Sequence, residues 1–337
     1  MRKISVVVFF TSLWSMSYGQ FPGSVDSLYT FIKSNSILRT TVEWTQIDEA
    51  FQEQIHTAKS LKDTMNCFVF VLKQLNDYHT QIFLNNEYYG YYPRFEDSVL
   101  IRLKTLSDRS SSSINQIHSE IISKEIGYIR VPTMQVYNQL QINNYAQSMA
   151  DKITELSKNC KNGFIIDLRL NGGGNVYPML SGLSLFMGNK TIGYETDVDE
   201  QVVRSWVLEN GNFVIGGYPS TNIKVERFLN LDSIPIVVII GPVTRSSGSM
   251  TAIAFKGRPN TIFIGEPTAN GYTTSNGYFQ FASNLTLNFA TNYVADRNKN
   301  IYKTTVNPDI IISHGDNFDH LMEDKKIQFA INWLNGK

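Results

Sequence analysis

The stretch Phe164-Ile165-Ile166-Asp167-Leu168-Arg169-Leu170-Asn171-Gly172-Gly173-Gly174 decides the fold of this chain. Its first residues are nearly all large and apolar, which is typical of a strand that a sheet buries on both faces. The three glycines that follow allow a tight turn and a close approach of the backbone to another group. A helix is expected next, because Pro178 falls where the first turn of a helix tolerates proline.

The same order of strand, turn and helix occurs once more. Residues 234–240 are rich in β-branched side chains, and Arg245-Ser246-Ser247-Gly248-Ser249 leads from them into a predicted helix that ends near residue 255. Both turns are then expected at the carboxyl end of a mostly parallel sheet, where α/β folds build their sites. The pattern therefore predicts an α/β fold in which helices flank a sheet.

The N-terminal part of the chain has a different pattern. Three apolar stripes at helical spacing lie within residues 24–78, and they predict a small helical cap. Side chains that alternate over residues 98–104 predict a strand. We divide the chain into a signal peptide (1–19), a helical cap subdomain (20–90) and an α/β domain that holds both turns (91–337).

The first residues indicate export. Arg2 and Lys3 precede a mostly apolar stretch at 4–16, and small residues follow at the usual cleavage positions before Gln20. We therefore expect a periplasmic or extracellular protein. No later run of 18 apolar residues occurs, so we expect no membrane span in the mature chain.

The composition is that of a folded protein without an electrostatic surface for nucleic acid. The 337 residues include 30 basic and 30 acidic side chains, and 42% of the chain is hydrophobic. Disorder would require lower hydrophobicity and higher net charge, and a nucleic-acid partner would require a basic patch. In an exported protein, Cys67 and Cys160 form either a disulfide or two buried thiols.

The two turns carry the candidate chemistry. Gly172 and Gly173 could form a phosphate cradle, an oxyanion hole or a turn without chemistry, but no Lys-Ser or Lys-Thr follows them as a P-loop would require. Ser247 lies where a strand turns into a helix. It could be a nucleophile with the Gly248 N–H as oxyanion donor, or it could cap the helix, a role that a neighbouring serine can also fill.

A serine nucleophile needs a base. Among five histidines, His79 is distinctive because it ends an apolar helical stretch where a strand begins. His314 and His320 flank an acidic segment, which raises the question of a metal site. That segment has the composition of a polar connection and the chain contains no His-Glu-x-x-His, so we expect no metal.

At this point the sequence resembles a known family. Asp167-Leu168-Arg169-Leu170-Asn171-Gly172-Gly173 is similar to the Asp-Leu-Arg-x-Asn-x-Gly-Gly signature of the S41 serine peptidases, which include the tail-specific proteases, tricorn core protease and the retinoid-binding-protein repeats. Four further segments agree in order: Asp77-Tyr78-His79-Thr80, Ser246-Ser247-Gly248-Ser249, Gly265-Glu266-Pro267-Thr268 and Val306-Asn307-Pro308-Asp309. The resemblance covers about residues 24–315 and implies a ClpP/crotonase-like sheet. The segment after His79 is too short for the PDZ domain that tail-specific proteases insert.

The resemblance implies roles for five residues. Ser247 would be the nucleophile and His79 the base, while backbone N–H groups of Gly248, Gly172 and Gly173 would form the oxyanion hole.

The chain departs from the family pattern in three places. The lysine that tail-specific proteases use as base is absent from Ala269-Asn270-Gly271-Tyr272, so the likeness is to the tricorn-like branch with a histidine base. Met250 replaces the usual glutamate of the nucleophile turn. The glutamate that would orient the histidine is missing before Pro308, and Glu266 is the candidate substitute.

We therefore expect a secreted or periplasmic serine endopeptidase that acts on peptides or unfolded proteins, and the resemblance implies no metal or organic cofactor. One alternative is a catalytically weak or inactive S41-like protein that binds an apolar ligand or a peptide, because a fold alone does not fix function. Crotonase-type acyl-CoA chemistry is a further alternative, but no basic cluster for the CoA phosphates occurs in the sequence.

Overall fold

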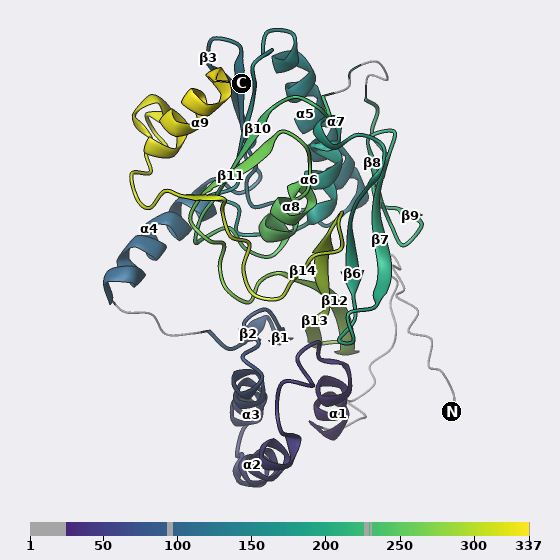
Figure 1. The fold of residues 1–337 in the computed structure, drawn as a ribbon. Coiled ribbons are helices and arrows are strands. Elements are labelled where there is room, and N and C mark those ends of the chain that lie inside the picture. Colours follow the sequence, from purple (N-terminus) through teal and green to yellow (C-terminus); the bar gives the residue numbers. More distant parts are fainter. Residues whose placement is uncertain (1–24, 93–96, 226–228, 230, 337) are drawn as a thin grey trace.

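The structure is a computed structural model that describes residues 25–92, 97–225, 229 and 231–336. It has an α/β architecture with two sheets, helices that flank them and three N-terminal helices packed at one end (Figure 1). The predicted α/β fold is therefore confirmed. The proposed signal peptide (1–19) lies outside the described residues.

The first sheet is largely parallel. Within the described residues its strands run in the order β15 (Ile310–Ile311), β11 (Thr261–Gly265), β10 (Ile236–Ile240), β5 (Gly163–Asp167), β4 (Ile126–Arg130) and β3 (His118–Ser123). Only the outer pair β3 and β4 is antiparallel. Every residue of β5 and β10 is buried, as expected for strands of a parallel sheet that is covered on both faces.

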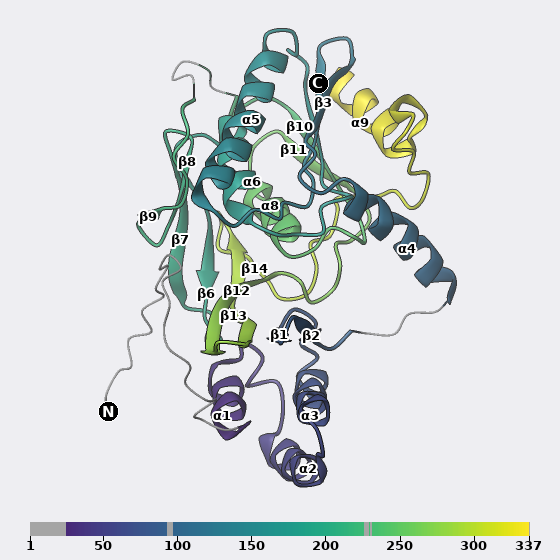
Figure 2. The same cartoon turned by 180° about the vertical axis from the view of Figure 1, so that it is seen from behind.

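Helices cover the two faces of this sheet. Ile166 and Val238 pack against α5 (Gln139–Ser157), α6 (Val176–Gly182) and α8 (Ser247–Phe255). The alternate residues of the same strands, Ile165 and Val237, pack against α9 (Lys325–Asn335). Figure 2 shows α9 and α5 on opposite sides of the sheet.

The two turns identified in the sequence lie at the same end of the first sheet. Strands β5 and β10 pair in parallel, with Ile239 opposite Asp167. The glycine turn therefore emerges beside the segment that leads into α8, as the sequence predicted. This geometry comes from the common direction of the strands, because parallel strands end at one edge.

The second sheet is antiparallel. In the described part of the chain its path is β2 (Glu87–Tyr89), β1 (Gln81–Leu84), β13 (Leu285–Asp296), β6 (Thr191–Thr196), β7 (Val202–Glu209), β8 (Asn212–Ile215) and β9 (Tyr218–Pro219). Two further strands, β12 (Thr274–Ala282) and β14 (Ile301–Tyr302), pair with β13.

The N-terminal helices share a core with this second sheet. They are α1 (Val25–Asn35), α2 (Trp44–Thr57) and α3 (Leu61–Gln74). Phe51 and Phe68 of the helices belong to one buried cluster with Leu287 and Phe289 of β13. Strand β1 follows α3 and pairs with β13, so it ties the helices to the sheet.

The predicted strand at 98–104 is wrong, because this segment lies in the helix α4 (Asp97–Ser112). The alternation of apolar and polar residues there is compatible with a helix as well. Leu103 and Leu106, three residues apart, face the same partners, Leu170 and Val243. That spacing places both leucines on one helical face.

Cys67 and Cys160 are both buried and free, so the structure has two thiols rather than a disulfide. Burial raises the pKa of the Cys160 thiol to about 11. No helix in the described part of the chain combines the length and the apolar composition that crossing a membrane requires.

Candidate active site

A tight turn between α3 and β1 fixes the backbone of His79. The buried carboxylate of Asp77 accepts hydrogen bonds from the N–H of His79 at 3.0 Å and from the N–H of Thr80 at 2.9 Å. The Thr80 hydroxyl donates to the other carboxylate oxygen at 2.6 Å. Burial raises the pKa of Asp77, although its hydrogen bonds act in the opposite direction.

The His79 ring lies between two hydroxyl groups. Its Nε2 atom is 2.8 Å from the Oγ of Ser246, and its Nδ1 atom is 2.7 Å from the Oγ1 of Thr274 at the start of β12. The side chain is only 7% exposed. Burial, with a smaller contribution from the positive charge of Arg245, lowers the pKa of His79 to about 3, so the ring is neutral and can accept a proton.

Ser246 occupies a strained turn between β10 and α8. Its backbone has φ 53° and ψ −126°, a conformation that an ordinary residue rarely adopts. Ser246 stands at the N-cap position of α8, yet its hydroxyl makes no capping hydrogen bond. The hydroxyl is instead directed to His79, and strained backbone of this kind is concentrated at active sites.

Gly173 allows Ser246 to take this position. A Cβ atom on Gly173 would lie 2.7 Å from the Cβ of Ser246, and the φ of Gly173 is +107°. Only glycine meets both conditions without displacing the serine. The glycine turn that decides the fold therefore also makes room for the hydroxyl of the site.

The expected pairing of Ser247 with His79 is wrong. Ser247 is the first residue of α8, it is buried, and its hydroxyl donates to the carbonyl of Gly174 at 2.6 Å. Neighbouring residues at the start of a helix point in different directions, so only one of the two serines can face the histidine. The structure brings His79 together with Ser246.

The expected oxyanion donors already have acceptors. The N–H of Gly248 donates to the carbonyl of Arg245 at 2.9 Å. The N–H of Gly172 donates to the Thr133 hydroxyl at 2.7 Å, and that of Gly173 to the Asn171 side chain at 3.0 Å. Gly248 has a packing role, because a Cβ there would lie 2.5 Å from the carbonyl oxygen of Asn171.

The N–H of Ser247 differs from these three. It has no acceptor among the described residues, and it directly follows Ser246 in the chain. In serine hydrolases with a strained nucleophile turn, the N–H after the nucleophile supplies an oxyanion donor.

Glu266 does not orient His79. Its carboxylate forms a two-pronged ion pair with Arg102 of α4 and lies 3.8 Å from the Nζ of Lys326. The Glu266 side chain therefore belongs to a charge network that joins α4 and α9 to the first sheet. Thr274 occupies the orienting position instead, and no carboxylate of the described residues contacts the His79 ring.

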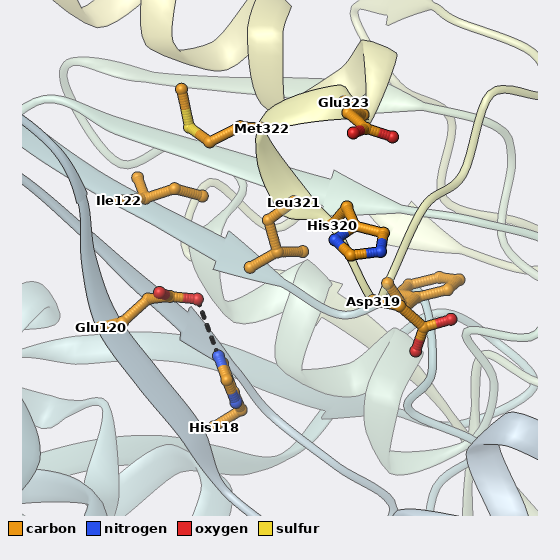
Figure 3. A pocket seen from close by; sticks show the side chains of 9 residues that line it. His118, Glu120, Ile122, Asp319, His320, Leu321, Met322 and Glu323 are labelled. Carbon is orange, nitrogen blue, oxygen red and sulfur yellow. Dashed lines mark hydrogen bonds and ion pairs between the residues drawn. The ribbon is translucent and has the colours of Figure 1, made fainter.

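Two other histidines border a separate surface hollow. His118 and His320 line a volume of about 330 Å³ between β3 and the 3₁₀ turn Leu321–Glu323 (Figure 3). His118 pairs with Glu120 at 2.9 Å, and neither Ser246 nor His79 lines the hollow. The described residues contain no group of three or more His, Cys, Asp or Glu that could hold a metal ion.

The sequence interpretation paired His79 with Ser247, whereas the structure places Ser246 beside the ring, and it did not include the contact with Thr274. Ser246 and Ser247 are chemically identical, and only the backbone conformation distinguishes them. Thr274 is 195 residues from His79, so no local pattern connects the two. No motif of the sequence analysis included Thr274, which lies at the start of β12.

Comparisons with known proteins indicate the family of the chain. The model of peptidase family S41 matches residues 125–312, which include the glycine turn and both serines. The chain belongs to peptidase family S41. It is also 31% identical over 270 residues to the nisin-resistance protein of Lactococcus lactis subsp. lactis, which covers 80% of this chain and 76% of that protein.

Solved structures share the S41 fold. A lipoprotein from Streptococcus agalactiae superimposes with a TM-score of 0.69 at 22% identity, over 97% of this chain and 99% of the other. The photosystem II D1 C-terminal processing protease superimposes with a TM-score of 0.51 at 14% identity, over 86% of this chain and 92% of the other. At these identities the likeness concerns the fold.

Proposed function

We propose that this S41 protein is an exported serine endopeptidase in which Ser246 is the nucleophile and His79 is the base. The observation that carries the proposal is the 2.8 Å contact between the Ser246 Oγ and the Nε2 of a neutral His79, made from a strained turn. A hydroxyl in contact with a buried neutral imidazole can lose its proton as it attacks.

The reaction proceeds by acyl transfer. His79 accepts the Ser246 proton while the Oγ attacks a peptide carbonyl, and His79 then gives that proton to the departing amine. Water, with His79 again as base, releases the acyl group from Ser246. The N–H of Ser247, which has no acceptor among the described residues, is the donor that we assign to the developing oxyanion.

The substrate class is a peptide or an unfolded protein chain. Membership of a peptidase family supports this class. The name of the L. lactis relative adds nisin as one peptide to include among test substrates.

A fluorophosphonate probe on the purified protein tests the mechanism, because it labels only an activated serine. We expect the label on Ser246. Ser246→Ala should lose labelling and peptide cleavage by about 10³-fold or more. Ser247→Ala is the matched control: it keeps the backbone N–H and should label within about tenfold of the wild type, while losing roughly 1 kcal/mol of stability with its buried hydrogen bond.

The labelling of the Ser246→Ala and Ser247→Ala variants decides which of the two serines is the nucleophile. Loss of labelling in Ser247→Ala with retention in Ser246→Ala would return the nucleophile to Ser247. Absence of both labelling and cleavage in the wild-type protein would contradict a peptidase.

A binding protein on the same scaffold is the second candidate function. The observation that favours it concerns the His79 imidazole, whose pKa is low and whose ring has no carboxylate partner among the described residues. Such an imidazole is a weaker base than one beside an acid. Tight binding of a peptide without cleavage or labelling is the result that this alternative predicts.

A further inference from the structure

The hydrogen-bond chain behind His79 continues beyond Thr274. The Thr274 Oγ1 is 3.2 Å from the Oδ1 of Asn276, and the Nδ2 of Asn276 donates to the carbonyl oxygen of His79 at 3.1 Å. The second contact fixes the orientation of the amide, because only its nitrogen can donate to a carbonyl. The Asn276 oxygen therefore faces the Thr274 hydroxyl as an acceptor.

The number of protons in this hydrogen-bond chain then determines which tautomer the neutral imidazole adopts. Thr274 has one hydroxyl proton, and the Asn276 oxygen can only accept it. The lone pairs of the Thr274 oxygen remain for the nitrogen of His79 at 2.7 Å, which must carry the hydrogen. In neutral His79 the hydrogen is then on Nδ1, and Nε2 presents its lone pair to the Ser246 hydroxyl.

We propose that Thr274 and Asn276 together replace the acid of a catalytic triad, as positioning residues that hold His79 in the tautomer with hydrogen on Nδ1. The inference rests on the proposed function of Ser246 and His79. It concerns residues of β12, a strand that contributes no side chain to the chemical step itself.

The alternative arrangement is disfavoured by the same contacts. If the Thr274 proton turned toward His79, two oxygen lone pairs of Thr274 and Asn276 would face each other in a buried position, since Thr274 is only 4% exposed. The hydrogen of His79 would then lie on Nε2, and the ring could not accept the Ser246 proton. In a serine protease, stabilising the wrong tautomer costs about 10⁴-fold in kcat.

A neutral partner and a carboxylate have different electrostatic effects. A carboxylate would orient the ring and also stabilise the imidazolium that forms during attack. Thr274 with Asn276 supplies the orientation without the negative charge. The site therefore keeps a correctly placed base that gains little charge stabilisation.

The first test is the tautomer itself, measured without any reaction. Protein labelled with ¹⁵N-histidine gives separate NMR signals for the two ring nitrogens, and His79→Gln assigns those of His79. We expect the protonated nitrogen at pH 7 to be Nδ1. Hydrogen on Nε2 in the wild-type protein would overturn the inference, even if the protein cleaves peptides.

The second test uses variants of near-equal shape. Thr274→Val removes the acceptor, and we expect fluorophosphonate labelling of Ser246 to fall about 10²-fold or more and the His79 hydrogen to move to Nε2. Thr274→Ser restores the hydroxyl and should label within about threefold of the wild type. Labelling of Thr274→Val at the wild-type rate would overturn the inference.

A matched control is available at the adjacent residue. Thr273 is fully buried, and its hydroxyl has no hydrogen-bond partner among the described residues. Thr273→Val should therefore leave the labelling rate and the tautomer unchanged, and an equal loss in both valine variants would assign the effect to packing and overturn the inference. The inference and the proposed function can fail separately. If the wild-type protein carries the His79 hydrogen on Nδ1 but neither labels nor cleaves peptides, the inference holds and the proposed function is contradicted.

Discussion

At the scale of single residues, the site depends on the backbone of Ser246. The strained dihedral angles turn its hydroxyl away from the helix N-terminus and toward His79. A serine in ordinary geometry at the same position would cap α8. Gly173 makes room for this conformation, because a Cβ atom there would lie 2.7 Å from the Cβ of Ser246.

Gly173→Ala should therefore reduce activity. The new methyl group would lie 2.7 Å from the Ser246 Cβ, and displacement of a reacting atom by about 1 Å can cost on the order of 10²-fold. Gly217→Ala is the matched control, because Gly217 also has positive φ (+85°) but open space around it. We expect fluorophosphonate labelling to fall at least tenfold in Gly173→Ala only. Equal labelling rates in the two variants would show that Ser246 accommodates the methyl group.

Burial and, to a smaller extent, the positive charge of Arg245 lower the pKa of His79, the proposed base. The groups that face His79 are Arg245, Tyr272, Ser246 and Thr274, and Asp77 binds its backbone. The pKa of His79 is about 3, below the usual 6.5, so the neutral form persists as the pH falls below 6.5.

Arg245→Gln removes a positive charge beside the ring, and this should raise the pKa of His79 and move the acidic limb of the labelling rate to higher pH. The pH dependence of fluorophosphonate labelling measures the shift. Lys33→Gln, which removes a charge paired with Asp48 in the cap, is the control that should leave the limb in place. An unchanged limb in Arg245→Gln would mean that burial alone sets the pKa.

The sequence predicted where the site lies in the fold better than it predicted which side chains contact one another there. The two turns were predictable from local signals, because each buried strand is followed by a segment rich in glycine or serine. The choice between Ser246 and Ser247 depends on one pair of dihedral angles, which composition does not encode. The partner of the His79 Nδ1 comes from β12, and a pairing across 195 residues requires the folded chain.

At the scale of elements, the strands were predictable where burial is complete. Every residue of β5 and β10 is buried, and Asp167 at the end of β5 is the one charged residue of the two strands, so their pattern has one interpretation. α4 was mistaken for a strand because a short alternating run fits either period, and its contacts with Leu170 and Val243 decide the outcome. Tertiary packing, rather than local preference, fixes that segment.

Glu266 contacts Arg102 of α4 and not the His79 ring, so we expect it to stabilise α4 and to take no part in proton transfer. Glu266→Gln should label within about twofold of the wild type, because the carboxylate contacts Arg102 and not His79. Stability should fall by about 1–3 kcal/mol, since Arg102 and the buried Lys326 lose a negative neighbour.

Thermal melting followed alongside labelling measures both effects of Glu266→Gln. Lys104→Gln is the control on the same helix, because its exposed ion pair with Asp108 contributes little to stability. A large loss of labelling in a folded Glu266→Gln protein would restore Glu266 as an orienting acid.

At the scale of the whole molecule, the proposed base and the proposed nucleophile come from different parts of the chain. His79 follows the cap helices, whereas Ser246 follows the first sheet. We predicted a boundary at residue 90 between a cap subdomain and an α/β domain. Strand β13 passes from the cap core, through Phe289, to the core of the first sheet, through Val294. A site assembled across such a shared strand requires both parts to be folded.

We therefore expect the cap and the sheets to unfold in one transition. Phe289 is fully buried, and Phe289→Ala should lower stability by about 3–5 kcal/mol. Single-tryptophan variants report the two parts separately, with Trp44 in the cap helix α2 and Trp206 in β7 of the second sheet. In urea, both signals should shift to the same lower midpoint, and labelling of Ser246 should disappear with them. A midpoint that moved for Trp44 alone would show that the cap folds as an independent domain, because the rest of the chain would then keep its stability without it.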